Sequence, residues 1–239
     1  NNGWIYRNDA IDLEASQDDT YTNGVHIGWA ATGEWMQYTV DVAEDGVYTA
    51  RVRTAANADG GAFHFKMGEA DITPLRVMPN TGDWQGFQTS EIPNIPLTVE
   101  DKELRVYIDK EGFNLGGKEF VKNGELTDLA TDYVSAITLD DQHVRLHLNK
   151  PLIAEGLVAG DLGLTVNDVD IPVTEAVFSP ASSRSIDLTT SATFRSEDVI
   201  QISYTVESLV ATDSTNLQQF IQHAVENTVA IITDIPGRL

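Results

Sequence analysis

The chain has 239 residues and no cysteine, which excludes disulfide bridges, zinc–thiolate sites and cysteine nucleophiles. Its net charge of −22, from 37 acidic against 15 basic residues, disfavours nucleic acid and anionic membranes as partners, because both are bound through clustered Lys and Arg. No apolar run reaches the roughly 18 residues of a membrane-spanning helix. The length suffices for two β-sandwiches of about 100–120 residues, each with a core of its own.

Short alternating segments separated by turn residues run through the first half of the chain and predict antiparallel β-structure. The turn residues include Asp45–Gly46 and the segments 79–82 (PNTG) and 93–96 (PNIP), because Pro, Asn and Gly punctuate strands. The strands predicted between these turns are 11–15, 35–42, 47–53, 60–67 and 104–108.

A polar stretch at 122–132 (KNGELTDLATD) separates this region from a second strand-rich region, and we place the linker at 124–132. The segment 217–229 is either a short helical turn or an extended closing segment, and both alternatives stay open. The strands predicted in the second region recur at the spacing of a sandwich and are 134–138, 144–148, 162–166, 186–188 and 199–205. The predicted fold is therefore all-β, with two β-sandwiches in tandem.

Four stretches in the first half carry a family resemblance. They are IDLEA at 11–15, GWAATGEWMQY at 28–38, NTGDW at 80–84 and GFNL at 112–115. In this order and spacing they make residues 9–122 similar to the family 6 carbohydrate-binding modules. The resemblance implies a jelly-roll module over residues 1–123.

The resemblance also implies a binding site. A pyranose ring has flat apolar faces and an equator of hydroxyls, so its binding from water needs flat apolar surfaces and a few placed polar groups. By resemblance, Trp29 and Trp84 form the aromatic walls of a site at the loop end of the sandwich, and Asn114 is the ligand-binding amide beside them. Trp35 lies in the strand 35–42 with Tyr38, and its equivalent in the family is a core residue.

A loop before Trp29 offers further residues for the border of this pocket. They are Tyr21, Asn23 and His26. No second His, Cys or carboxylate shows metal-ligand spacing with His26, so we do not expect that histidine to hold a metal.

A structural calcium ion is the one cofactor expected. Asp12 and Glu14 alternate with apolar residues and so share one face of the strand 11–15. Modules of the family commonly carry calcium at this place, bound by carboxylate and carbonyl oxygens. By this resemblance Asp12 and Glu14 are two ligands, and Glu119 is the ligand from the last strand.

The second region, residues 133–230, resembles the SwmB-like, immunoglobulin-like bacterial domains. The resemblance rests on 134–139, on 144–148 with Asn149–Lys150–Pro151, on 199–205 (VIQISYT) and on 213–227. No aromatic pair falls on a predicted loop here, so we expect a structural role. Residues 231–239 are interpreted as a linker, because 235–239 (IPGRL) resembles the lead-in to a further family 6 module.

The function predicted from these features is non-catalytic binding of a polysaccharide or oligosaccharide. The sequence contains no nucleophile elbow, His-Glu-x-x-His or phosphate-binding glycine loop. We expect a monomeric, secreted fragment that is covalently linked in the full-length protein to a catalytic domain, a glycoside hydrolase. The expected ligand is the end of a β-glycan, with β-1,3-glucan favoured and agarose next. Two alternatives are a cell-surface adhesion module without glycan affinity, and catalysis by the chain itself.

Overall fold

The computed structural model describes residues 12–20 and 23–230. The fold is all-β, as predicted, and the described residues form no α-helix. None of these residues forms a helix long and apolar enough to cross a membrane. The chain divides into two compact units, residues 1–129 and 130–239, and each is described by itself.

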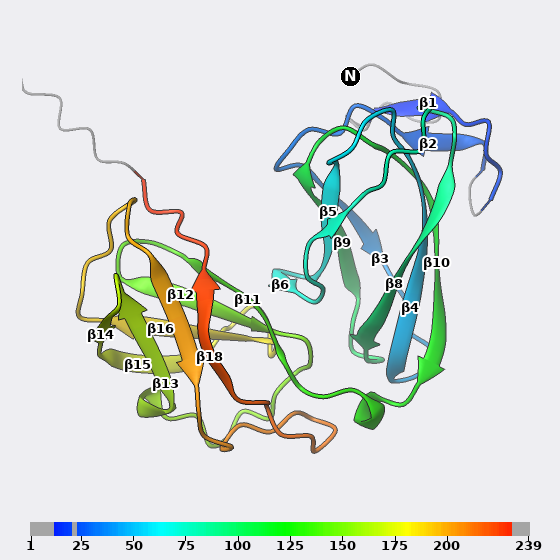
Figure 1. Cartoon of the computed structure of the whole chain (residues 1–239). Coiled ribbons are helices and arrows are strands. Elements are labelled where there is room, and N and C mark those ends of the chain that lie inside the picture. The colour runs from blue at the N-terminus through cyan, green and yellow to red at the C-terminus, as the bar shows by residue number, and fades with distance from the viewer. Residues whose placement is uncertain (1–11, 21–22, 231–239) are drawn as a thin grey trace, which may run out of the picture. The chain divides into compact units, whose positions relative to one another are not determined.

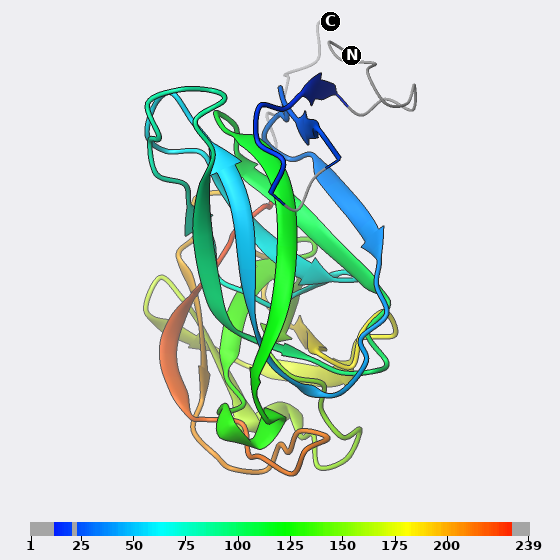
Figure 2. The same ribbon diagram turned by 90° about the vertical axis from the view of Figure 1, so that its right-hand side faces the viewer.

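The first unit contains two sheets that share one apolar core. One sheet has the order β1 (Leu13–Ala15), β2 (Val25–Ile27), β10 (Asn114–Gly124), β4 (Gly46–Ala55) and β8 (Gln88–Leu97). The other has the order β3 (Trp35–Thr39), β9 (Glu103–Lys110), β5 (Ala62–Met67) and β6 (Ala70–Asp71), with β7 (Arg76–Val77) paired to β5. In Figures 1 and 2 the long strands β4, β8 and β10 run side by side, with β1 and β2 at one end of the unit.

The core of the first unit is built from the inward-facing residues of both sheets. Phe63 and Phe65 of β5 are fully buried and meet Val52 of β4 and Ile92 of β8 in one cluster. Period-two alternation along each strand places these side chains inward, as the sequence pattern predicts.

The prediction of a turn at 93–96 is wrong, because β8 runs through both prolines. β8 is the edge strand of its sheet, so the missing N–H groups of Pro93 and Pro96 cost no hydrogen bond on the open side. A register shift opposite β4 and a positive φ of 62° at Asn94 accommodate one extra residue there. The turn residues therefore mark a β-bulge.

The assignment of Trp35 to the core is also wrong. Its side chain is 51% exposed, and the guanidinium of Arg105 lies 4.5 Å from the centre of its ring. Along β3 it is Met36 that is buried, and Tyr38 packs against the core. Trp35 and Tyr38 are three residues apart and thus point to opposite faces of a strand.

The second unit also contains two sheets around its own core. Their orders are β11 (Tyr133–Thr138), β12 (His143–Leu148), β16 (Ser185–Thr190), β15 (Val173–Phe178), and β14 (Val169–Ile171), β13 (Leu162–Val166), β17 (Ile200–Tyr204), β18 (Phe220–Val225). The segment 217–229 contains the strand β18, so the extended alternative is correct. Two short 3-10 turns complete the described elements, Leu126–Asp128 and Ala159–Asp161.

A buried histidine links three strands on the second sheet of the first unit. His64 of β5 is hydrogen-bonded through Nδ1 to Asp109 of β9 at 2.9 Å and through Nε2 to Asp71 of β6 at 3.1 Å. Lys66 lies 2.9 Å from the same Asp71 carboxylate. Burial alone lowers the pKa of His64, but the hydrogen bonds and charges of Asp109 and Asp71 outweigh it and raise this pKa to about 9.

We expect this histidine to stabilise the first unit in acid and neutral solution and to stop doing so in alkali. The folded pKa of His64 exceeds its ordinary value of 6.5. The contribution of His64 to the free energy of unfolding is therefore complete below pH 6.5 and is lost as the pH rises through about 9. Because burial lowers the pKa of Lys118 to about 8 in the same unit, the difference between wild type and His64→Gln isolates the histidine. Urea unfolding followed by tryptophan fluorescence measures it, since all four tryptophans belong to residues 1–129.

The expected difference in unfolding free energy between wild type and His64→Gln is large near pH 6 and shrinks toward pH 10. These two pH values lie below the ordinary histidine pKa of 6.5 and above the folded pKa of about 9. A difference that is constant with pH would contradict the charged pairing of His64.

Candidate functional site

A pocket of about 480 Å³ opens at the end of the first unit that carries β1 and β2. Four segments form it: β1, the residues that follow β2, the loop before β8, and the turn between β9 and β10 together with the first residue of β10. Its lining residues are Glu14, Trp29, Ala30, Ala31, Trp84, Glu111, Gly112, Phe113 and Asn114.

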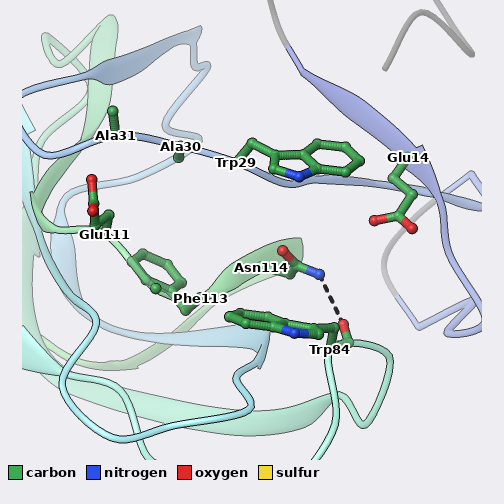
Figure 3. A pocket seen from close by; sticks show the side chains of 9 residues that line it. Glu14, Trp29, Ala30, Ala31, Trp84, Glu111, Phe113 and Asn114 are labelled. Carbon is green, nitrogen blue, oxygen red and sulfur yellow. Dashed lines mark hydrogen bonds between the residues drawn. The ribbon is translucent and has the colours of Figure 1, made fainter. Parts of the chain in front are cut away.

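Two indole rings form opposite sides of this pocket. Figure 3 shows Trp29 and Trp84 facing each other across it, with the side chain of Asn114 between them. Trp29 is 51% exposed and Trp84 is 44% exposed, so neither ring belongs to the core. Two exposed indoles on one pocket offer a large apolar surface that only a ligand or water covers.

The backbone holds each ring in place by a local device. Trp29 has a φ of 51°, in the left-handed region that bulky residues avoid and that is enriched at functional sites. It follows Gly28, whose N–H donates to the carbonyl of Asp12 at 3.0 Å and so ties the end of β2 to the preceding strand. Trp84 lies in a loop fixed by a hydrogen bond from the Gly82 N–H to Asn80 Oδ1 at 2.8 Å.

The amide of Asn114 is oriented by the loop of Trp84. Asn114 is the first residue of β10 and is buried, and its Nδ2 donates to the carbonyl oxygen of Trp84 at 2.8 Å. One amide hydrogen is thereby used inside the protein. The side-chain oxygen and the second amide hydrogen remain for a ligand, so the amide can accept one hydrogen bond and donate another.

Glu14 contributes a carboxylate to the same pocket. It lies on β1, and its Oε2 accepts a hydrogen bond from Nε2 of His26 on the neighbouring β2 at 3.1 Å. His26 is 2% exposed and packs edge-on against the ring of Phe87. Burial lowers the pKa of His26, against the opposing effect of Glu14, so the ring is neutral near pH 7 and its Nε2 carries the proton.

The structure brings three of the predicted binding residues together and separates others from them. Trp29, Trp84 and Asn114 line the pocket. His26 does not line it but lies behind Glu14, and Asn23 is exposed in the turn between β1 and β2. Tyr21 lies outside the described residues.

Six of the nine lining residues were not predicted as binding residues, among them Glu14, Glu111 and Phe113. Glu111 directly precedes the Gly-Phe-Asn-Leu stretch, and Phe113 lies within it. The motif itself was therefore the sequence signal that could have identified both residues. Glu14 was predicted as a calcium ligand. The alternation of Glu14 with Leu13 predicts which face of the strand carries Glu14. No sequence pattern predicts which residues this face contacts.

The three predicted calcium ligands, Asp12, Glu14 and Glu119, do not form a cluster of three carboxylates in the part of the chain that is described. Glu14 contacts His26, whereas Glu119 on β10 forms an ion pair with Arg51 of β4 at 3.6 Å. The described residues contain no group of three or more His, Cys, Asp or Glu side chains placed to hold a metal. Calcium stays a prediction, and a chelator that lowers the unfolding temperature of the first unit would support it.

One protein-family model matches the first part of the chain. Residues 6–122 match the model of the carbohydrate binding module family 6. This part of the chain includes all nine residues that line the pocket. A comparison with curated protein sequences gave no match.

Solved structures of family 6 modules are similar to this chain. The C-terminal module of LamC, a marine laminarinase from Zobellia galactanivorans, is 25% identical over 49% of this chain and 92% of that chain, with a TM-score of 0.43. A module of lichenase 5A from Cellvibrio mixtus, solved with cellotriose, is 23% identical over 47% and 87%, with a TM-score of 0.43. A β-1,3-glucan-binding module from Bacillus halodurans is 25% identical over 46% and 84%, with a TM-score of 0.40.

Proposed function

We propose that the first unit, whose residues 6–122 match the family 6 carbohydrate-binding modules, holds a saccharide ring between Trp29 and Trp84 and catalyses no reaction. The observation that carries this proposal is the pair of exposed indoles that face each other across one pocket, with an oriented amide between them. Such a pocket offers the apolar surface and the hydrogen-bonding groups that binding of a sugar ring requires.

The expected binding mode follows from the chemistry of the pocket. The apolar faces of a pyranose ring lie against the two indoles, and the ring hydroxyls lie toward Asn114. The amide accepts from one hydroxyl through Oδ1 and donates to another through its free N–H. Because the Trp84 loop already orients the amide, little side-chain entropy is lost on binding.

We further propose that the ligand is the end of a β-glycan, with β-1,3-glucan first and agarose next. Enclosure between two rings suits a chain end better than a continuous chain. The indole of Trp29 provides a larger apolar wall than a tyrosine ring at this position would, and a larger wall suits a glucan. A single site of this kind is expected to bind with a Kd of roughly 10 μM to 1 mM. An affinity-gel panel of laminarin, agarose, xylan and cellulose derivatives identifies the glycan, and retardation by none of them would contradict the proposal.

End recognition makes a specific prediction. Blocking the non-reducing end of the bound oligosaccharide with a bulky substituent is expected to weaken binding at least tenfold, because the blocked residue no longer fits between the indoles. Isothermal titration with matched blocked and free oligosaccharides measures the effect. The same oligosaccharide blocked at the reducing end is the control, and equal affinity for all three would contradict end recognition.

The role proposed for this binding is to keep an attached catalytic domain, a glycoside hydrolase, near its substrate in a secreted, monomeric protein. The gain comes from effective concentration and needs no new chemistry. The second unit, proposed to be immunoglobulin-like, then acts as a spacer. Released reducing ends on incubation of the chain itself with these glycans would contradict the non-catalytic role.

A further inference from the structure

The pocket carries acidic side chains and no basic ones. Its nine lining residues include Glu14 and Glu111 but neither Lys nor Arg. Figure 3 shows the two carboxylates in different parts of the pocket, Glu14 beside the rim of the Trp29 ring and Glu111 near Phe113. A ligand between the indoles therefore meets negative charge that no cation in the lining compensates.

Glu14 is the better fixed of the two carboxylates. Its Oε2 accepts from Nε2 of the buried His26, whose ring is held against Phe87. Glu111 is exposed and solvated. A carboxylate anchored at one oxygen by a buried donor presents its other oxygen to the pocket in a defined direction.

Glu14 also lies beside the amide of Asn114. A Cβ placed on Gly28 would lie 3.4 Å from Asn114 Oδ1 and 3.7 Å from Glu14 Oε2, so the two acceptor oxygens flank the same glycine. A larger side chain at this position would project between them. His26 Nε2 lies 4.0 Å from the same point and donates to Glu14 Oε2, so Asn114 Oδ1 and the second oxygen of the Glu14 carboxylate are the acceptors offered to a ligand group that donates hydrogen bonds.

We propose that Glu14 is a specificity-determining residue that selects saccharides by charge, with His26 as its positioning residue. This rests on the function proposed above. The pocket accepts a sugar that presents a hydroxyl or a protonated amine to Glu14 and rejects one that presents a carboxylate or a sulfate. A hydroxyl donates to the carboxylate, a protonated amine adds charge attraction, and an anion is repelled where solvent screening is reduced.

The experiment compares three forms of one oligosaccharide by isothermal titration. Laminaritriose, its 6-amino-6-deoxy derivative and its C6-oxidised uronate differ only in the group at C6, and the pH is kept below the pKa of the amine. We expect wild type to bind the amine roughly five- to tenfold more tightly than the neutral trisaccharide, and the uronate at least tenfold more weakly.

The variant Glu14→Gln keeps the shape and the hydrogen-bonding capacity of the side chain while removing its charge. It is expected to lose most of the preference for the amine and to recover binding of the uronate, each measured relative to the same variant's affinity for neutral laminaritriose, which itself falls because the charge-assisted hydrogen bond to the carboxylate is lost. His26→Phe removes the donor that orients Glu14. This variant is expected to show a weaker preference for the amine and a weaker rejection of the uronate than wild type. Glu103→Gln removes one charge from an exposed position of β9 and is the charge-matched control.

The outcomes separate the two proposals. If neutral laminaritriose binds and the uronate binds equally well, or if Glu14→Gln and Glu103→Gln change the ratios alike, the charge selection is wrong and the saccharide site is intact. If no saccharide of the glycan panel binds, the proposed function fails and the inference fails with it. If only another neutral glycan binds, the same substitutions at its C6 position decide the inference.

Discussion

Replacing Trp84 with alanine is expected to abolish retardation of the protein in a gel that contains the bound glycan. The indole provides one complete wall of the pocket, and central aromatic residues of this kind contribute about 2–3 kcal/mol or more to binding. That loss weakens binding by roughly 30- to 150-fold, which moves a Kd in the expected range to about 0.3 mM or higher. Trp29→Ala is expected to act in the same direction from the opposite wall.

The matched control is Trp35→Ala. Trp35 is as exposed as Trp29 but lies on β3 and does not line the pocket. Affinity electrophoresis and titration of the three variants compare the loss of one exposed indole at different places on the same unit. Retained binding in Trp84→Ala, with the tryptophan fluorescence of a folded protein, would contradict the pocket as the binding site.

The second large effect is expected in the other unit, from a buried ion pair. Nζ of Lys150 lies 2.7 Å from Oδ2 of Asp213, with side chains only 1% and 9% exposed. Thr215 donates to the same carboxylate through Oγ1 at 2.6 Å. Burial alone raises the pKa of Asp213, but the hydrogen bonds of Lys150 and Thr215 outweigh it and lower this pKa, so the pair is charged near neutral pH.

Asp213→Ala is expected to destabilise the second unit by about 3–5 kcal/mol, because it removes the carboxylate that is ion-paired with the buried lysine ammonium. In calorimetry this appears as a fall of more than about 10 °C in one unfolding transition. The double variant Lys150→Met with Asp213→Leu is expected to recover much of the loss, since replacing both charges with apolar groups is far less costly than removing one. A single variant as stable as wild type would show that the ammonium reaches water.

Several features of the fold could be predicted from the sequence because they depend on local patterns. Alternation placed five of the ten strands described in the first unit and five of the eight described in the second, and strand 162–166 coincides with β13. The Gly-Asp turn placed Trp84 on a loop. These features follow from side-chain period and turn chemistry, which act over a few residues.

The features that sequence reasoning missed depend on what lies next to a strand. Pro93 and Pro96 signal a turn in any sequence, and only the edge position of β8 makes them compatible with a strand. Trp35 is large and apolar, but the residue beside it, Met36, occupies the inward position of β3. A strand has two faces, and the identity of one residue does not decide which of them is buried.

The residues of the site also divide into those that local sequence motifs predict and those whose role depends on a neighbouring strand. The motifs identified Trp29, Trp84 and Asn114, because each lies in a characteristic loop or strand end. The role of Glu14 depends instead on the pairing of β1 with β2, which brings His26 behind the carboxylate. This pairing links residues 12 positions apart and was not visible in the alternation of either strand.

The most direct measurement is a titration of the tryptophan indole N–H signals by NMR, assigned through single Trp substitutions, with the oligosaccharide that the glycan panel identifies. Contact of the sugar with both rings should shift the signals of Trp29 and Trp84 together, with one common Kd, and leave that of Trp35 in place. Saturation of binding while the Trp29 and Trp84 signals stay unmoved would contradict the account.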